Sequence, residues 1–145
     1  MSKVKASMHG AVSIVNAIAT GKGATLGISL GIEAIVETQP GKGIIFENKE
    51  SNLSSRLIRN VVEMSVPKSE LEKNKITIFV KSEIPSGYGL KSSSAISSVI
   101  SLACAKIFKP KANDLEILRD GVHASIKSKV SITGAFDDAC ACYFG

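Results

Sequence analysis

The chain has 145 residues, of which 44% are hydrophobic and 21% are charged, and its formal net charge is +5 at pH 7. This length supports one domain with its own core, and the composition is typical of a globular protein. A run of eighteen or more apolar residues is missing from the sequence, which excludes an ordinary membrane-spanning helix.

The first third of the chain predicts strands. Residues 2–20 predict a strand that leads into a short segment bounded by glycines. Alternating apolar and polar residues predict two further strands at 24–30 and 31–39, and a third at 43–47. The turn residues from Gln39 to Gly43 are typical of a hairpin between the last two of these strands.

The rest of the chain predicts mainly helices. Residues 51–66 carry apolar side chains at helical spacing, and residues 75–84 alternate as a strand does. A long apolar helix is expected at 92–108. Another is expected at 113–129, because its first residues form a capping box. Strands, a helix, a strand and two helices in this order indicate an α+β fold.

Cysteines and lysines are not arranged as in a metal site or a nucleic-acid binder. Cys104 lies in an apolar helix pattern, and Cys140 and Cys142 are too close together for the usual zinc spacing. We interpret all three as small buried residues. The lysines are spread along the chain and only 5% of the residues are aromatic, so a small anionic ligand explains the charge at least as well as nucleic acid does. A solvated basic surface accounts for most of these lysines.

The N-terminal segment does not read as a signal peptide. Ser7, His9 and Ser13 interrupt its apolar residues, and a signal peptide needs a longer unbroken apolar region. We therefore expect a cytoplasmic protein that does not enter a membrane.

A phosphate-binding loop is predicted where the strand at 75–84 joins the helix at 92–108. Free N–H groups and a partial positive charge at the first turn of a helix bind phosphate, and glycines let the backbone approach it closely. Lys91 adds a cation, and the serines that follow it add hydroxyls for phosphate or a magnesium ion. The alternative interpretation is a glycine-rich turn that binds nothing. Neither G-x-x-x-x-G-K-[ST] nor G-x-G-x-x-G is present.

The residues from Pro85 to Ala95 read PSGYGLKSSSA. This stretch resembles the P-x-x-x-G-L-G-S-S-A phosphate motif of the GHMP kinases, with Lys91 in place of the usual glycine and Ser94 in place of the usual alanine. That variant is similar to the archaeal-type shikimate kinases, as are the segments 10–28 and 131–145. The three ordered matches cover almost the whole chain.

The resemblance implies a reaction and a fold. The reaction is the ATP-dependent phosphorylation of shikimate to shikimate 3-phosphate, with Mg²⁺ as the metal ion. The fold is a two-layer GHMP-kinase N-terminal domain, of the ribosomal protein S5 domain 2-like type, with a left-handed β-α-β unit. Such a unit departs from the general handedness rule.

The resemblance also implies roles for individual residues. The phosphate loop, residues 85–95, is expected to bind ATP, and Ser93 aligns with the serine that contacts Mg²⁺. The candidate ATP-binding residues are Pro85, Ser86, Gly87, Tyr88, Gly89, Leu90, Lys91, Ser92, Ser93, Ser94 and Ala95. Lys22 is a candidate for the shikimate carboxylate or the transferring phosphate, together with Thr20 in the same TGKGAT segment. The alternative for Lys22 is a solvated loop lysine.

Two adjacent carboxylates are the catalytic candidates. Asp137 aligns with the aspartate that accepts or orients the attacking hydroxyl, and Asp138 is the competing choice. Neighbouring residues of a helix point about 100° apart, so only one of them is expected to face the substrate. The alternative is a charge pair that merely favours the helix N-terminus. A magnesium-binding glutamate is missing, because the sequence has none between Glu116 and Asp137.

The length of the chain predicts that it is incomplete. GHMP kinases are about twice as long, and their third motif lies in the C-terminal half. Residues 1–145 are therefore expected to be the N-terminal ATP-binding part, which pairs with its missing C-terminal half or self-associates. The helix faces expected to be partly uncovered carry Leu53, Leu57, Val61 and Ile107, together with the terminal residues 139–145.

Two other functions remain open. One is another GHMP small-molecule kinase, of the homoserine or mevalonate type. The other is a non-catalytic module of the same fold that binds nucleic acid or a protein partner. Carboxylates beside a phosphate loop disfavour a module that binds a phosphate backbone.

Overall fold

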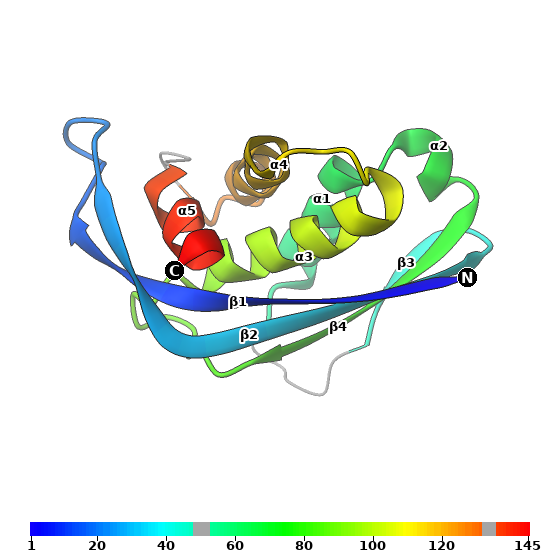
Figure 1. Ribbon diagram of the computed structural model, residues 1–145, viewed down its shortest axis with the longest axis horizontal. Helices are drawn as coiled ribbons and strands as arrows, with labels where there is room; N and C mark the ends of the chain where they lie inside the picture. Colours follow the sequence, from blue (N-terminus) through cyan, green and yellow to red (C-terminus); the bar gives the residue numbers. More distant parts are fainter. Residues whose placement is uncertain (48–52, 132–135) are drawn as a thin grey trace.

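The computed structural model describes residues 1–47, 53–131 and 136–145. A four-stranded sheet forms one layer and the helices cover one of its faces (Figure 1). This is the α+β architecture that the order of elements predicts. None of the helices in the described parts is long and apolar enough to cross a bilayer.

The strands are β1 (Ser2–Val15), β2 (Ala24–Pro40), β3 (Gly43–Phe46) and β4 (Asn74–Ser82), in the spatial order β1-β2-β4-β3. The β1–β2 and β2–β4 pairs are antiparallel, and β3 runs parallel to β4. The two strands predicted at 24–30 and 31–39 are thus one long strand. β1 runs on to Val15 and forms a long hairpin with β2.

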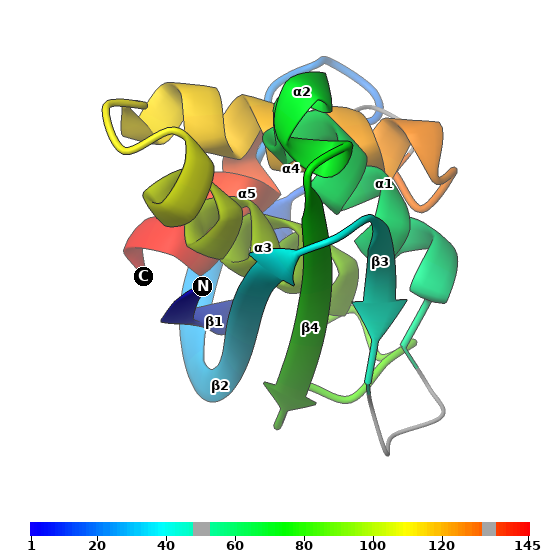
Figure 2. The same cartoon turned by 90° about the vertical axis from the view of Figure 1, so that its right-hand side faces the viewer.

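The predicted hairpin at residues 39–43 is wrong. β4 lies between β2 and β3, so the chain turns at Gly41 and Gly43 without pairing the two strands that it joins. Figure 2 shows β3 at the edge of the sheet, parallel to β4. The connection through the helices between these two strands is the expected β-α-β unit, and its left-handed sense stays a prediction.

The helices are α1 (Ser55–Ser65), α2 (Lys68–Leu71), α3 (Ser92–Phe108), α4 (Asp114–Lys127) and α5 (Phe136–Phe144). α3 has the predicted bounds and packs against β1 and β2. α4 packs on α1, α3 and α5, on the side away from the sheet (Figure 1). The predicted capping box begins α4: the Asn113 side chain accepts from the Glu116 N–H at 3.0 Å, and the Glu116 carboxylate accepts from the Asn113 N–H at 3.0 Å.

The apolar face of α1 is covered, although the length of the chain predicts that it is partly uncovered. Leu57 and Val61 are buried, and Leu53 and Ile107 are half-buried against the same core. α1 lies against α3, α4 and β3, so this part of the chain supplies its own cover. Large exposed apolar side chains gather instead at the far end of the β1–β2 hairpin, which projects beyond α5 (Figure 1). They are Val12, Ile14, Val15, Ile18 and Leu26.

The cysteines follow the prediction in two cases of three. Cys104 and Cys142 are buried, and burial raises the pKa of each thiol to about 12. Cys140 is only half-buried, and burial raises its pKa less far. No group of three His, Cys, Asp or Glu side chains that could hold a metal ion occurs in the described ranges.

Candidate functional site

The phosphate loop turns sharply between the end of β4 and the start of α3. Gly87, Gly89 and Lys91 have positive φ angles of 86°, 74° and 58°. Such angles are easy for glycine and uncommon for other residues. Residues 85–89 of the loop are exposed, and no side chain caps the α3 N-terminus that follows. The loop therefore leaves the backbone N–H groups of the first helical turn available to an anion.

β1 supports this loop from the inside. The Ala11 N–H donates to the Leu90 carbonyl at 3.1 Å, at a register shift where β1 departs from regular pairing with β2. Gly10 makes this approach possible, because a Cβ atom there would lie 3.1 Å from the Leu90 carbonyl oxygen and 3.2 Å from Ile84 Cγ1. The loop is thus attached to the sheet just before α3 begins.

Lys91 occupies the position where the related motif has glycine. Its left-handed backbone costs roughly 1 kcal/mol relative to glycine. Its ammonium group lies 3.1 Å from Oδ2 of Asp138, and both side chains are about one-quarter exposed, at 25% and 27%. An ion pair that is partly shielded from solvent is worth about as much as this strain. This contact joins the phosphate loop to α5.

Thr25 of β2 lies between the two candidate carboxylates. Its Oγ1 is 3.0 Å from Oδ2 of Asp137 and 3.0 Å from Oδ1 of Asp138. The two aspartates leave the helix in different directions, yet both reach the same hydroxyl. Both aspartates thus face Thr25, whereas the expectation that only one of them faces the substrate stays a prediction. Which of the two accepts from a substrate stays a prediction.

Sequence reasoning missed Thr25. Its only signal was its place: it lies two residues after Gly23, in the same TGKGAT segment that drew attention to Lys22. Gly23 is also part of the site, because a Cβ atom there would lie 2.9 Å from Cγ of Asp137 and closer still to Oδ2. The turn between β1 and β2 thus lies directly against the acidic end of α5.

Thr20 and Lys22 lie in that turn, and both are exposed. The Thr20 hydroxyl is 3.3 Å from the backbone N–H and 3.3 Å from the carbonyl of Lys22, so it shapes the turn locally. Lys22 directly precedes Gly23, the residue that lies against Asp137. A role for either side chain in binding a substrate stays a prediction.

The serines after Lys91 differ in their surroundings. The Ser93 carbonyl accepts from the Ser97 hydroxyl at 2.8 Å, whereas Ser94 and Asp138 line a small cavity between α3, α4 and α5. This cavity of about 20 Å³ has room for about one water molecule. Serine hydroxyls are oxygen donors that suit Mg²⁺, and this ion takes many of its other ligands from phosphates and water. The residues present therefore fit Mg²⁺ at the start of α3, and Ser93 as its ligand stays a prediction.

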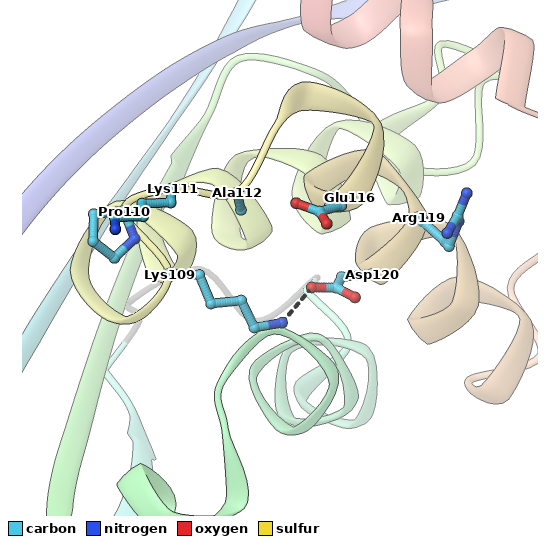
Figure 3. Close-up of a pocket in the computed structure, with 7 residues that line it drawn as sticks. All are labelled: Lys109, Pro110, Lys111, Ala112, Glu116, Arg119 and Asp120. Carbon is cyan, nitrogen blue, oxygen red and sulfur yellow. Dashed lines mark hydrogen bonds and ion pairs between the residues drawn. The ribbon is translucent and has the colours of Figure 1, made fainter.

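A larger hollow of about 620 Å³ lies at the opposite end of α3 (Figure 3). Three of its five charged side chains are engaged with one another or with the backbone. The Lys109 ammonium lies 2.9 Å from Oδ2 of Asp120, and the Glu116 carboxylate serves the capping box. This hollow contains none of the predicted site residues, and we assign it no ligand.

The comparisons with known proteins agree with this geometry. The sequence profile of the family described as GHMP kinases N terminal domain matches residues 52–145. A shikimate kinase of Pyrococcus furiosus is 41% identical over 137 residues, which are 93% of this chain and 50% of that protein. A shikimate kinase of Thermococcus kodakarensis is 40% identical over 145 residues, covering 98% of this chain and 53% of that protein.

The chain thus spans about half the length of the curated relatives that it matches. Among solved structures, the mevalonate kinase of Methanococcus jannaschii superposes with a TM-score of 0.78 at 15% sequence identity. That superposition covers 97% of this chain and 52% of the other, and it shows a shared fold. The profile match extends over more than half of the residues and includes the phosphate loop and α5, so this chain belongs to the GHMP kinase N-terminal domain family.

Proposed function

We propose that this chain is the ATP-binding part of a kinase that transfers the γ-phosphate of ATP to a hydroxyl of shikimate. The observation that carries the proposal is the contact between the phosphate loop and the acidic end of α5, through Lys91 and Asp138 at 3.1 Å. Phosphoryl transfer needs the phosphate and the attacking hydroxyl close together, with charge stabilised around them. The relatives that share about 40% of the sequence are named shikimate kinases, which supports shikimate as the acceptor.

In this proposal the phosphate loop binds the triphosphate through the backbone N–H groups at the start of α3. Lys91 adds positive charge beside them. Asp137 accepts a hydrogen bond from the shikimate hydroxyl and holds it in line with the γ-phosphate. Mg²⁺, when bound with ATP, neutralises phosphate charge, and the Ser93 hydroxyl is the ligand that we assign to it.

We further propose that residues 1–145 are the N-terminal domain of the enzyme and that a C-terminal half, or a second copy of this chain, completes it. Support comes from the half-length match to the relatives and from the exposed side chains of the β1–β2 hairpin. Ile14, Ile18 and Leu26 are 69%, 62% and 57% exposed, next to the turn that carries Lys22. Apolar side chains gathered in this way commonly mark an interaction surface.

A product assay tests the proposed function. The complete gene product is incubated with ATP, Mg²⁺ and one alcohol at a time, and ADP release and the ³¹P spectrum of the product are recorded. We expect phosphorylation of shikimate, with homoserine and mevalonate as comparison alcohols. If ADP were released with homoserine or with mevalonate but not with shikimate, that alcohol would be the acceptor. ATP hydrolysis at a rate that none of the three alcohols changes would contradict a small-molecule kinase.

A further inference from the structure

The Lys91 ammonium group belongs to the phosphate loop, yet it pairs with a carboxylate of α5 rather than pointing freely at the space above the loop. Its backbone is the N-cap residue of α3, where backbone N–H groups attract anions. A triphosphate bound there carries several negative charges, whereas Asp138 carries one. The ion pair therefore competes with the phosphates for the same cation.

Asp138 has a second contact that responds to this competition. Its Oδ1 lies 3.0 Å from the Thr25 hydroxyl, which is also 3.0 Å from Oδ2 of Asp137. A hydroxyl has one hydrogen, so Thr25 donates to only one carboxylate at a time. Because Lys91 offsets part of the Asp138 charge, the pairing favours Asp137 as the acceptor of that hydrogen.

We propose that ATP binding breaks the Lys91–Asp138 ion pair and transfers the Lys91 ammonium to the phosphates. Asp138, now without its cation, becomes the stronger acceptor for the Thr25 hydroxyl. Oδ2 of Asp137 then loses the Thr25 hydrogen, and with one hydrogen bond fewer the Asp137 carboxylate becomes a stronger acceptor for the substrate hydroxyl. Asp138 is thus a positioning residue that makes Asp137 a stronger acceptor when ATP occupies the loop. This inference rests on the proposed function for the identity of the nucleotide, and not on shikimate as the acceptor.

A double-mutant cycle on nucleotide affinity tests the exchange of partners. The dissociation constant of MgATP is measured by calorimetry for the parent protein, Lys91→Met, Asp138→Asn and the double variant, each as the complete gene product. Lys91→Met should weaken binding about tenfold, because a charged contact to phosphate is lost. Asp138→Asn should tighten binding, because Lys91 no longer has to leave a partner.

The coupling between the two changes is the decisive quantity. Removing the Asp138 charge also relieves its repulsion of the phosphates, and that effect is common to both backgrounds. We expect Asp138→Asn to tighten MgATP about two- to fivefold more in the parent protein than in the Lys91→Met background, which is the range for an ion pair of this exposure. Equal effects in both backgrounds would show that the ion pair survives in the complex. Weaker binding in Asp138→Asn would assign that carboxylate to the metal ion; either result overturns the proposal.

The Lys109–Asp120 pair provides the matched control. It joins α3 to α4 at 2.9 Å, with side chains 33% and 24% exposed, at the far end of α3 from the loop. Lys109→Met and Asp120→Asn should leave MgATP affinity unchanged. If the Lys91→Met variant does not fold, Lys91→Gly serves instead, because glycine accepts the left-handed backbone.

The outcome for the proposed function can be told apart from the outcome for the ion pair. A parent protein that binds MgATP without phosphorylating shikimate would remove shikimate as the acceptor, while the cycle still decides whether Lys91 changes partners. A parent protein that binds no MgATP would overturn both.

Discussion

Gly23 and Asp137 are so close that only a glycine fits between the β1–β2 turn and the acidic end of α5. A Cβ atom on Gly23 would lie 2.9 Å from Cγ of Asp137, and 3.1 Å from the Cβ of Ala17 on its other side. Real Cβ atoms essentially never approach other heavy atoms to within 3.0 Å. Any side chain at position 23 must therefore displace the Asp137 carboxylate from its present position beside Thr25.

Gly23→Ala should lower the turnover number about tenfold or more, because small displacements of a reacting group are costly. The affinity for MgATP should not change, since the atoms nearest to a Cβ at position 23 belong to Asp137 and Ala17 and not to the phosphate loop. Steady-state kinetics and calorimetry measure the two effects separately. Gly31→Ala, on β2, is the control: its Cβ would meet only the flexible end of Glu83, at 3.3 Å, and the Met8 carbonyl oxygen at 4.0 Å. Equal turnover in both variants would contradict a role for the Asp137 carboxylate.

Thr25→Val should also lower turnover, because the hydroxyl that holds the two carboxylates in position is lost. MgATP affinity should stay close to that of the parent, because valine keeps the shape of threonine. Thr25→Ser should restore most of the loss, since it returns the hydroxyl between the two carboxylates. If Thr25 acted only by packing, the Thr25→Val variant would turn over at least as fast as the Thr25→Ser variant. The comparison of the two variants at saturating ATP therefore decides between packing and hydrogen bonding.

Gly89→Val should weaken MgATP binding strongly. Gly89 has a φ of +74°, and a branched side chain there both strains the backbone and obstructs a phosphate that approaches it. Gly43→Val also strains the backbone, at φ +128°, and this residue begins β3, away from the loop. Calorimetry on both variants separates general strain from loss of the phosphate site. The assignment of the loop fails if the two variants bind MgATP equally well.

Asp137→Asn should reduce turnover roughly a hundredfold or more, because it removes the group that accepts from the attacking hydroxyl. Asp138→Asn should cost less, because its carboxylate acts through Thr25 and Lys91. Turnover at saturating ATP and shikimate measures both. The opposite ranking would move the accepting role to Asp138, and two nearly active variants would exclude both residues from it.

Local patterns predicted the elements of this fold better than their pairing. The bounds of α3 and the capping box of α4 follow from side chains within a few residues of one another, so the sequence is sufficient. The partner of β3 is not a local property. The turn at Gly41 and Gly43 resembles that of a hairpin, but β4, which follows only after α1 and α2, takes the place next to β2.

The candidate site was predicted in the same uneven way. Motif resemblance identified the phosphate loop and the aspartates, since each is a continuous stretch of sequence. Thr25 could not be found in this way, because its role depends on β2 and α5 meeting across 112 residues of chain. Its contact with both carboxylates is also not evident from helical spacing alone: a hydroxyl placed between two side chains reaches both, although they leave the helix about 100° apart.

The buried thiols make a prediction about alkaline pH. Burial raises the pKa of Cys104 and of Cys142 from 9.0 to about 12 in the folded protein. Between these values the unfolded chain loses thiol protons that the folded chain keeps, so the free energy of unfolding falls as the pH rises above 9. Urea titrations at about pH 8 and about pH 10.5 measure this loss, and Cys104→Ala should make it smaller because one of the two groups is gone. Cys140→Ala is the control, since that thiol is only half-buried and its pKa is raised less far. A loss of stability that is the same in both variants would show that Cys104 does not cause it.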